Sequence, residues 1–242
     1  REFTLMVIAN EHGAPVPLIP SEIKVEEGCL FDYRRKYLPT ANTAWPCPPG
    51  FSDEVIARIR EQAADLFKQM GMRDFTRCDG WVLDDGQVIF SDFNPISGFE
   101  QNSFLFQQAT RLGWTHRGIL THILKTACHR YKISWNFEVS PSSSERQPVF
   151  VLMGGSTPER QVSLMSGTNV WLNLRDSEKY EPLPFFLDQA HRVWPLRYQD
   201  ALHHTVEEVY ENCLKSKSQQ LRIDRLAEPI HRAFEGSLDK DY

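Results

Sequence analysis

Two acidic residues and an arginine lie close together in a stretch that is predicted to form a β-hairpin. Residues 74–104 read DFTRCDGWVLDDGQVIFSDFNPISGFEQNSF, and the Asp85-Gly86 pair in the middle is a strong hairpin-turn signal. A two-residue loop at this pair would place Asp79 opposite Asp92 on the neighbouring strand. The same register would place Arg77 opposite Asn94.

Carboxylates that face each other on neighbouring strands repel, which lowers stability unless a positive charge offsets them. A divalent cation would do so, and Mg²⁺ usually combines carboxylate ligands with water and phosphate oxygens. Asp79, Asp92 and Asn94 are therefore candidate metal ligands. Arg77 could bind a phosphate or an oxyanion on the same face. The alternative is a solvent-facing strand pair with ordinary surface charges.

Apolar residues near the turn favour the metal site over that alternative. In the two-residue register, four apolar side chains would share the face of the carboxylates: Trp81, Leu83, Val88 and Phe90. A face with so many apolar side chains is not a solvated face.

The loop after the hairpin contains a glycine and a serine that could contact a ligand. Gly98 can let the backbone approach a ligand closely. Ser103 opens the next predicted helix, where backbone N–H groups attract anions. Ser103 could also be only the N-cap of that helix, and the two roles are compatible.

The pattern R-x-D, then D-x-N, then a glycine loop ending in serine resembles the metal and phosphate end of an ATP-grasp domain. More narrowly, it resembles the D-alanine–D-alanine ligase family, in which the second acidic residue is Glu instead of Asp92. The resemblance implies that Asp79, Asp92 and Asn94 hold Mg²⁺ or Mn²⁺. It further implies that the remaining residues of the pattern act on the substrate. Arg77 and the Gly98 N–H would stabilise the oxyanion. Ser103 and Phe104 would bind substrate, with Ser103 binding the carboxylate of the second D-alanine.

Two other segments resemble the same family. Residues 31–37 (FDYRRKY) resemble its mobile loop, in which Lys36 would reach the ATP phosphates and Tyr37 would hydrogen-bond across the closed site. Residues 154–167 (GGSTPERQVSLMSG) resemble the beginning of a ligase, in which Glu159 would position the first D-alanine and Ser163 would lie near its amino end. Without the resemblance, residues 31–37 are an exposed basic-aromatic loop, and Glu159 is an acidic first-turn residue.

Hydrophobic periodicity and capping residues predict the elements that position these residues. The first part is expected to contain a strand at 2–9, an antiparallel neighbour at 14–25, a helix at 52–70 with Ser52 as N-cap, and a helix from Thr115 to Tyr131. The second part is expected to contain a strand at 149–153, a helix from Pro158 to Leu174 capped by Thr157, two short strands within 182–195, and polar helices at 203–218 and 222–235. The histidines are expected on solvated helix faces: His116, His122 and His129, with His203 and His204.

The expected fold class is α/β (α+β). Residues 1–135 would form the back half of an ATP-grasp domain with an antiparallel sheet, and the polar segment 136–147 would be a linker. Residues 148–242 would be the βα start of a Rossmann-like N-terminal ligase domain. The end of a ligase thus precedes its beginning. Two arrangements would produce this order: a tandem of two ligase copies or a circular permutation. The polar linker favours the tandem.

Composition limits the function classes. A net charge of −5 over 242 residues gives no reason to expect nucleic acid or an anionic membrane as a partner. No apolar run is long enough to span a bilayer, and five cysteines without a CxxC pattern argue against disulfides and structural zinc. A soluble protein in a reducing compartment is expected. The chain begins at Arg1 within a predicted strand, so we expect a fragment of a longer protein.

The resemblance implies an ATP- and Mg²⁺-dependent ligase that joins two D-alanines through an acylphosphate. Its partners would be ATP, D-alanine, and the rest of the polypeptide or a second ligase copy, and the related ligases are usually dimers. Double ligases of this kind resemble those of plants and mosses. This resemblance implies that the protein could be located in the plastid stroma or in the cytoplasm. D-lactate or D-serine as second substrate stays open, and the isolated fragment is expected to be inactive. The alternative is a degenerate copy with a structural or assembly role, because Asp92 replaces Glu.

Overall fold

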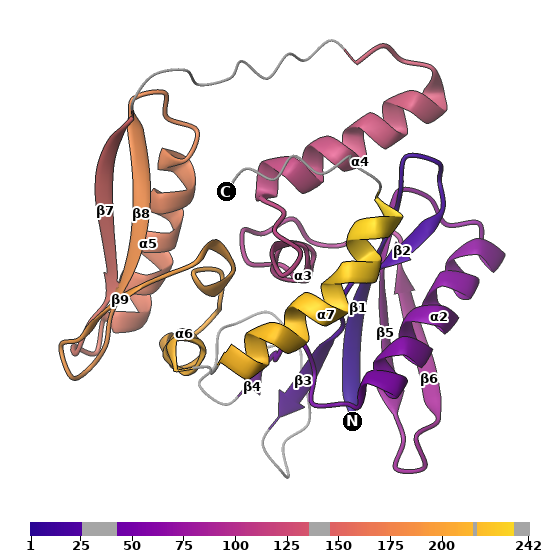
Figure 1. The fold of residues 1–242 in the computed structure, drawn as a ribbon, viewed down its shortest axis with the longest axis horizontal. Helices are drawn as coiled ribbons and strands as arrows, with labels where there is room; N and C mark the ends of the chain where they lie inside the picture. The colour runs from indigo at the N-terminus through magenta and orange to yellow at the C-terminus, as the bar shows by residue number, and fades with distance from the viewer. Residues whose placement is uncertain (26–42, 136–145, 215–216, 235–242) are drawn as a thin grey trace. The chain divides into compact units, whose positions relative to one another are not determined.

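The structure is a computed structural model that describes residues 1–25, 43–135, 146–214 and 217–234. Contacts divide the chain into two compact units (Figure 1). The first contains the described residues up to Trp135 together with those from Lys217 onward. The second contains the described residues from 146 to 214. Each unit has its own β-sheet, and each is described separately below.

The first unit is built on an antiparallel sheet with β1 near its centre. In spatial order its strands are β4 (Thr43–Ala44), β3 (Ser21–Val25), β1 (Glu2–Ala9), β5 (Phe75–Val82) and β6 (Val88–Asn94), and β2 (Pro15–Pro17) also pairs with β1. Both β2 and β3 run antiparallel to β1, as the sequence predicts for residues 14–25. The expected antiparallel sheet is therefore confirmed.

Helices cover both faces of this sheet, which explains why seven of the eight residues of β1 are buried. On one face, α2 (Asp53–Gln69) packs Ile56, Ile59 and Phe67 against the alternate residues Phe3 and Leu5 of β1. On the other face, α3 (Phe104–Thr110) and α4 (His116–Tyr131) contact β1. A strand that is apolar over most of its length fits a position between two helical layers.

The predicted N-caps of α2 and α4 are confirmed, but two histidines expected on solvated helix faces, His122 and His203, are buried. Ser52 caps α2 by accepting from the Val55 amide, and Thr115 caps α4 by accepting from the Gly118 amide. His122 was expected on a solvated face, but it is only 7% exposed and its Nε2 lies 2.9 Å from the Ala9 carbonyl oxygen. Burial lowers the pKa of His122, so the neutral ring is favoured in this position.

The β5–β6 hairpin differs from the predicted two-residue turn. The Leu83 amide donates to the Gln87 carbonyl, so the loop contains the three residues 84–86 and Gly86 adopts a φ of +82°. Near the loop, Trp81 therefore pairs with Ile89 and Gly80 pairs with Phe90. The expected Trp81–Phe90 and Leu83–Val88 pairs are wrong.

A β-bulge then restores the predicted register at the open end of the hairpin. The register shifts between Asp79 and Gly80, and Ser91 is the extra residue. Beyond it Asp79 pairs with Asp92, and Arg77 pairs with Asn94, as predicted. Without the extra residue, an uninterrupted ladder would place Ser91 opposite Asp79 and turn Asp92 toward the face that α2 covers.

The bulge also changes which apolar residues share the face of the carboxylates. Val88 and Phe90 pack against the core beneath α2, on the opposite face. Trp81 remains on the carboxylate face but is 42% exposed. The expectation that four apolar side chains shield the carboxylates is therefore wrong, because it assumed an unbroken ladder.

The second unit is a β–α–β arrangement extended by a short strand and a helix. The parallel strands β7 (Gln147–Gly154) and β8 (Tyr180–Leu187) are joined through α5 (Arg160–Leu174), and β9 (Val193–Pro195) pairs antiparallel with β8. A 3₁₀ turn at Tyr198–Asp200 and α6 (Val206–Cys213) follow. The expected βα start is confirmed, but α5 begins at Arg160 with Glu159 at the N-cap position, so Thr157 is not the cap.

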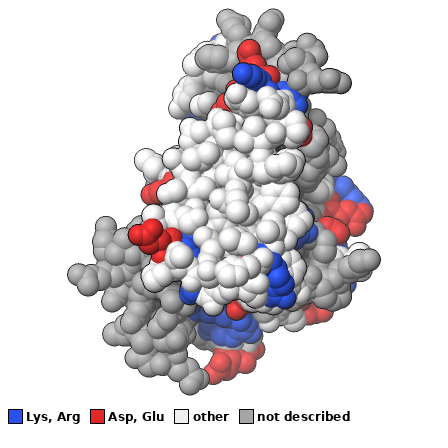
Figure 2. Space-filling model, turned by 90° about the vertical axis from the view of Figure 1, so that its left-hand side faces the viewer, with Lys and Arg blue, Asp and Glu red and all other residues white. Residues whose placement is uncertain are grey.

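One face of the second sheet packs on α5, and the other carries exposed apolar side chains. Val151 and Met153 of β7 are buried, whereas Phe150 is 68% and Leu152 54% exposed. The Phe150 ring lies edge-on to Phe185 of β8, with ring centroids 5.4 Å apart. Figure 2 views this side and shows an uncharged surface, with charged residues toward its margins.

The last described helix, α7 (Lys217–Ala233), groups with the first unit, although residues 148–242 were expected to form one domain. Arg222 of α7 donates to the carboxylate of Asp53 and to the Phe51 carbonyl oxygen. Phe234 packs edge-on against Trp114, with ring centroids 4.6 Å apart. No helix in the described ranges is long and apolar enough to cross a membrane. The four cysteines in those ranges are free.

Candidate functional site

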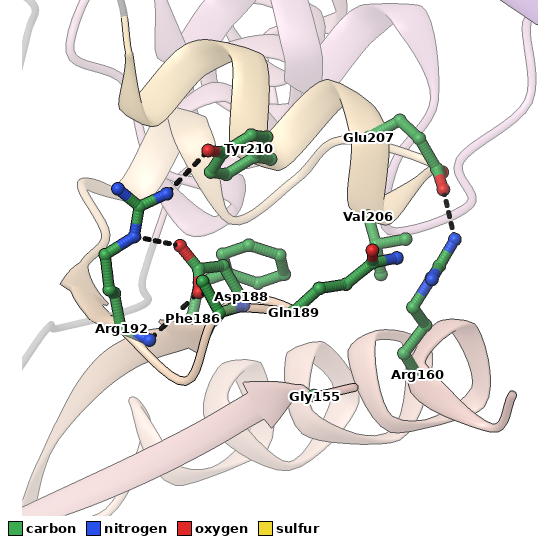
Figure 3. A pocket seen from close by; sticks show the side chains of 10 residues that line it. Gly155, Arg160, Phe186, Asp188, Gln189, Arg192, Val206, Glu207 and Tyr210 are labelled. Carbon is green, nitrogen blue, oxygen red and sulfur yellow. Dashed lines mark hydrogen bonds and ion pairs between the residues drawn. The ribbon is translucent and has the colours of Figure 1, made fainter. Parts of the chain in front are cut away.

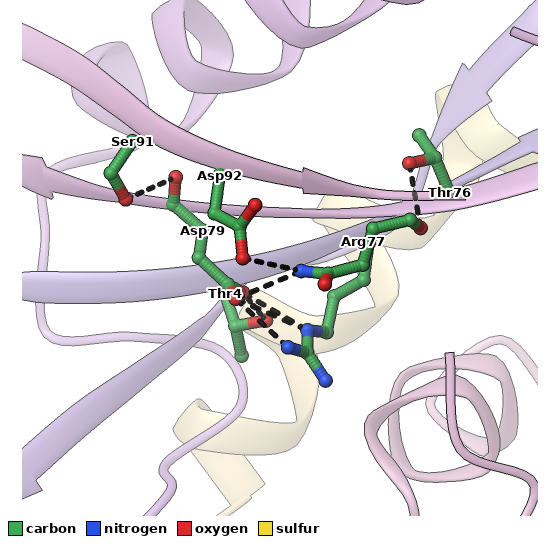
Figure 4. Close-up of polar contacts among 7 residues, drawn as sticks. Thr4, Thr76, Arg77, Asp79, Ser91 and Asp92 are labelled. Atoms are coloured by element: carbon green, nitrogen blue, oxygen red, sulfur yellow. Dashed lines mark hydrogen bonds and ion pairs between the residues drawn. The ribbon is translucent and has the colours of Figure 1, made fainter. Parts of the chain in front are cut away.

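Asp79 lies at the centre of a polar cluster on one face of the first sheet (Figure 4). The Thr4 hydroxyl, on neighbouring strand β1, donates to Asp79 Oδ1 over 2.7 Å. Arg77 donates from Nε and Nη2 to Asp79 Oδ2 over 3.2 and 3.0 Å. Two side chains thus hold the carboxylate from different directions.

Asn94 links the two carboxylates of the hairpin. Its Nδ2 donates to Asp92 Oδ2 over 3.0 Å and to Asp79 Oδ2 over 3.4 Å. The structure therefore brings together Arg77, Asp79, Asp92 and Asn94, as the sequence predicts. The bulge makes this possible, because it places Asp92 on the same face as Asp79.

Exposure differs sharply between the two carboxylates. The side chains of Arg77 and Asp79 are 12% and 13% exposed, whereas Asp92 is exposed to solvent. Next to Asp79 in the chain, Cys78 points to the buried α2 side; burial, together with the negative charge of Asp79, raises the pKa of its thiol to about 12. The thiol therefore stays protonated at neutral pH, and the reactive groups of the cluster are the oxygens of Asp79 and Asp92.

The cluster has the donor chemistry that Mg²⁺ binds in proteins. Two carboxylates and one amide oxygen are hard ligands, and the solvent exposure of Asp92 leaves room for water or phosphate oxygens. Within the described residues, no group of three or more His, Cys, Asp or Glu side chains could enclose a metal ion. Asp79, Asp92 and Asn94 are therefore the groups of this cluster that could hold Mg²⁺.

The loop after β6 carries Gly98 and ends at Ser103. A Cβ on Gly98 would meet Glu100 Oε2, which is the far end of a flexible side chain. Ser103 occupies the N-cap position of α3 but makes no side-chain capping bond. Its Oγ is buried and has no hydrogen-bond partner among the described residues. Phe104 packs against Trp45 with ring centroids 5.1 Å apart.

The other predicted site residues lie elsewhere. Glu159 is exposed at the start of α5, in the second unit. Ser163 lies one turn further along α5, where its Oγ accepts from the Gly154 amide over 3.1 Å and so ties the helix to the end of β7. Lys36 and Tyr37 lie outside the described residues.

Sequence reasoning missed Thr4 and Ser91. Thr4 contacts Asp79 only because β1 pairs with β5 in a register that places them opposite each other. A threonine in a strand otherwise rich in apolar residues was the available signal. Ser91 had no signal, because a bulge depends on packing across the sheet and not on the residue type alone.

Comparison with known protein families gives two matches. The family model described as D-ala D-ala ligase C-terminus matches residues 1–125, which is more than half of the chain and includes the Asp79 cluster. The chain belongs to the D-alanine–D-alanine ligase family. The family model of the D-ala D-ala ligase N-terminus matches residues 148–238, so the C-terminal part of a ligase precedes an N-terminal part along this chain.

Individual ligases match part of the chain. The D-alanine–D-alanine ligase of Pseudarthrobacter chlorophenolicus is 30% identical over 119 residues, which cover 48% of this chain and 31% of that protein. The ligase of Staphylococcus carnosus is 26% identical over 131 residues, which cover 54% of this chain and 36% of that protein. The chain thus spans about a third of the length of these curated relatives.

Solved structures of ligases match over similar shares. A D-alanine–D-alanine ligase from Coxiella burnetii is 25% identical, with a TM-score of 0.43 over 55% of this chain and 33% of that one. A ligase from Bacillus anthracis complexed with ATP is 18% identical, with a TM-score of 0.43 over 54% of this chain and 39% of that one.

Proposed function

We propose that this chain contributes to an ATP- and Mg²⁺-dependent ligase that joins two D-alanines. The observation that carries the proposal is the cluster of Arg77, Asp79, Asp92 and Asn94, which lies within the segment matched by the ligase C-terminal family model. The chain spans about a third of its relatives, so other residues would supply the nucleotide-binding half of the site.

The reaction that we propose proceeds through an acylphosphate. ATP transfers its terminal phosphoryl group to the carboxylate of the first D-alanine and leaves as ADP, and the amine of the second D-alanine attacks the acylphosphate and releases phosphate. Mg²⁺, when bound, would neutralise phosphate oxygens near Asp79, Asp92 and Asn94. Arg77 holds the Asp79 carboxylate in place and brings a positive charge to the region where negative charge develops.

We propose that Gly98 and Ser103 act on the substrate side of the same site. The Gly98 N–H would donate to the developing oxyanion. The Ser103 hydroxyl is not used to cap α3, so it remains available for the carboxylate of the second D-alanine. Phe104 would pack beside that substrate.

By family resemblance, Lys36 would bind the ATP phosphates, Tyr37 would hydrogen-bond across the closed site, and Glu159 would position the first D-alanine. Ser163 would lie near that amine. Its hydroxyl already accepts from the Gly154 amide, which supports a positioning role. We also propose that the order of the two family matches reflects a tandem of ligase copies in a plastid or cytoplasmic protein, and that the protein is a homodimer.

Replacing Asp92 with Asn tests the metal role in a protein that contains the nucleotide-binding half. The expected result is loss of most ligase activity with an unchanged circular dichroism spectrum, because Asn removes the charge but keeps the shape. Asp84→Asn is the matched control, since it removes the same charge from the exposed loop of the same hairpin. Normal turnover of Asp92→Asn would remove Asp92 from the metal site.

A second candidate function is a structural or assembly role for a degenerate ligase copy. The observation in its favour is Asp92, whose side chain is shorter than the Glu of the family. Calorimetric titration of the same protein with Mg²⁺-ATP separates the two functions. Heat of binding that is lost in Asp92→Asn supports the ligase, and no heat in the unaltered protein supports the structural role.

A further inference from the structure

The loop between β6 and α3 is exposed over most of its length. Gly98, Phe99, Glu100 and Gln101 are exposed, and Phe99 contacts Phe75 of β5 edge-on, with ring centroids 5.4 Å apart. A segment with so little buried surface opens at low free-energy cost unless hydrogen bonds hold it. The hydrogen bonds of this loop therefore decide how firmly Gly98 and the serine at its end are placed.

Three consecutive carbonyl groups at the end of the loop accept hydrogen bonds. The first belongs to Glu100 and accepts from the Ser103 amide over 2.9 Å, which closes a turn. The third belongs to Asn102 and accepts from Nε2 of Gln107 over 2.7 Å. Gln107 is only 6% exposed in α3, so water does not readily compete for this bond. The turn is thus tied to α3 on one side.

His116 holds the middle carbonyl, that of Gln101. The histidine is the first residue of α4, and its ring stacks on Phe106 of α3 with centroids 3.9 Å apart and planes at 24°. Phe106 is 2% exposed, so the stack fixes the plane of the imidazole. In this orientation Nε2 lies 2.6 Å from the Gln101 carbonyl oxygen. A carbonyl oxygen only accepts, so Nε2 carries a proton and donates.

Ser103 lies directly after these three carbonyls. Its Oγ is buried, makes no capping bond to α3, and has no hydrogen-bond partner among the described residues. A buried hydroxyl without a partner is costly, and it is expected where a ligand supplies the missing bond. The place of this hydroxyl depends on the turn before it, and the turn is held from α4 by His116.

We propose, on the basis of the function proposed above, that His116 is a positioning residue for the second D-alanine. Its Nε2–H fixes the Gln101 carbonyl and with it the turn that ends at Ser103, whose hydroxyl meets the substrate carboxylate. His116 does not touch the substrate. Its contribution is to hold the loop in the binding geometry before the substrate arrives, which lowers the cost of ordering the loop on binding.

The first D-alanine is assigned to the other unit. In the function proposed above Glu159 positions this substrate, and the next residue, Arg160, lines a cavity that also includes Gly155 (Figure 3). None of the residues that line this cavity belongs to the segment 98–116. A change at His116 is therefore expected to weaken the binding of the second D-alanine and to leave that of the first unaltered.

Initial rates test this role in a protein that contains the nucleotide-binding half. Two D-alanine molecules bind, so the dependence of the rate on D-alanine concentration contains two KM values. His116→Phe keeps an aromatic ring against Phe106 and removes the donor. It is expected to raise one of the two KM values by about five- to tenfold and to leave the KM for ATP unchanged. A variant that only folds less well would lower kcat alone. A rise in neither or in both of the D-alanine KM values overturns the proposal.

His116→Gln separates the hydrogen bond from the ring stack. Its amide nitrogen reaches about as far as Nε2 of histidine and can donate to the Gln101 carbonyl, but it has no ring. We expect it to restore most of the KM that His116→Phe loses. His129→Phe is the matched control, because it makes the same change at an exposed position in the last turn of α4. Equal impairment of His116→Gln and His116→Phe would assign the effect to the ring and overturn the proposal.

Amide hydrogen exchange in the 242-residue chain tests the loop without any ligase activity. The Ser103 amide donates to the Glu100 carbonyl only while the turn is closed. Nuclear magnetic resonance is expected to show at least about fivefold faster exchange of this amide in His116→Phe than in the unaltered chain or in His129→Phe. Unchanged exchange overturns the proposal. Absence of ligase activity in the unaltered protein would instead refute the proposed function, and the exchange rates would still decide whether His116 holds the loop.

Discussion

Thr4 connects the central strand of the first sheet to the carboxylate cluster. Its hydroxyl donates to Asp79 at a position that is 2% exposed, so water cannot readily replace it. Thr4→Val keeps the shape and removes the donor. We expect it to lower the free energy of unfolding by about 1–2 kcal/mol.

Urea denaturation followed by circular dichroism measures this effect. Thr4→Ser keeps the hydroxyl and is expected to recover most of the loss in hydrogen bonding. Equal stability of Thr4→Val and the unaltered chain would mean that the Thr4–Asp79 bond contributes nothing to the fold.

Cys78 makes the stability of the first unit sensitive to alkaline pH. Burial and the Asp79 charge raise the pKa of its thiol from 9.0 to about 12, so the folded state holds this proton more tightly than the unfolded state. The stabilisation is complete below pH 9.0 and is lost as the pH rises toward about 12. Urea unfolding at neutral pH and at about pH 10 should show a smaller alkaline loss for Cys78→Ala than for the unaltered chain. An identical loss in both would exclude Cys78 as the titrating group.

At the residue scale, the sequence was enough to group Arg77, Asp79, Asp92 and Asn94, because all four lie on one hairpin with a recognisable turn. It was not enough to find Thr4, whose place beside Asp79 depends on a pairing between strands far apart in the chain. The burial of His122 had the same origin, since its partner Ala9 lies at the end of β1.

At the element scale, the β5–β6 hairpin combines a three-residue loop with a bulge. An Asp-Gly pair is compatible with loops of two or three residues, so the sequence could predict a hairpin but not its loop length. The two departures have opposite effects on register, which is why Asp79 still pairs with Asp92. The prediction was correct at the site for a reason that the sequence did not reveal.

Two single-residue deletions in this hairpin should have very different effects. Deleting Asp84 shortens an exposed loop and leaves every strand pair in place. Ile89 lies between the loop and the bulge. Its deletion shifts the register of the strand there and forces Phe90 or Val88 away from the core beneath α2. We expect the second deletion to cost at least about 2 kcal/mol more than the first. Urea unfolding followed by tryptophan fluorescence compares them, and equal stability would contradict the observed register.

At the scale of the whole molecule, α7 completes the first unit although it follows the second unit in the chain. Its hydrophobic pattern predicts a helix, but periodicity cannot specify which unit the apolar side contacts. The contacts of Arg222 with Asp53 and Phe51, and of Phe234 with Trp114, supply that information.

Two alanine substitutions on α7 test this assignment. Ile230 is fully buried, so Ile230→Ala should lower the free energy of unfolding of the first unit by about 2–4 kcal/mol. Leu221 is 68% exposed on the same helix, and Leu221→Ala should have little effect. Thermal unfolding measures both. A similar small effect of the two substitutions would show that α7 does not pack as the structure describes.

The return of the chain to the first unit also has a mechanical consequence. β1 and α7 lie at opposite ends of the described chain and belong to the same unit. In an optical trap that pulls on the two ends, tension would pass from β1 to α7 through the first unit. The second unit would carry no load until α7 detached. Its unfolding step should therefore appear only after the first rupture, whatever the relative stabilities of the two units.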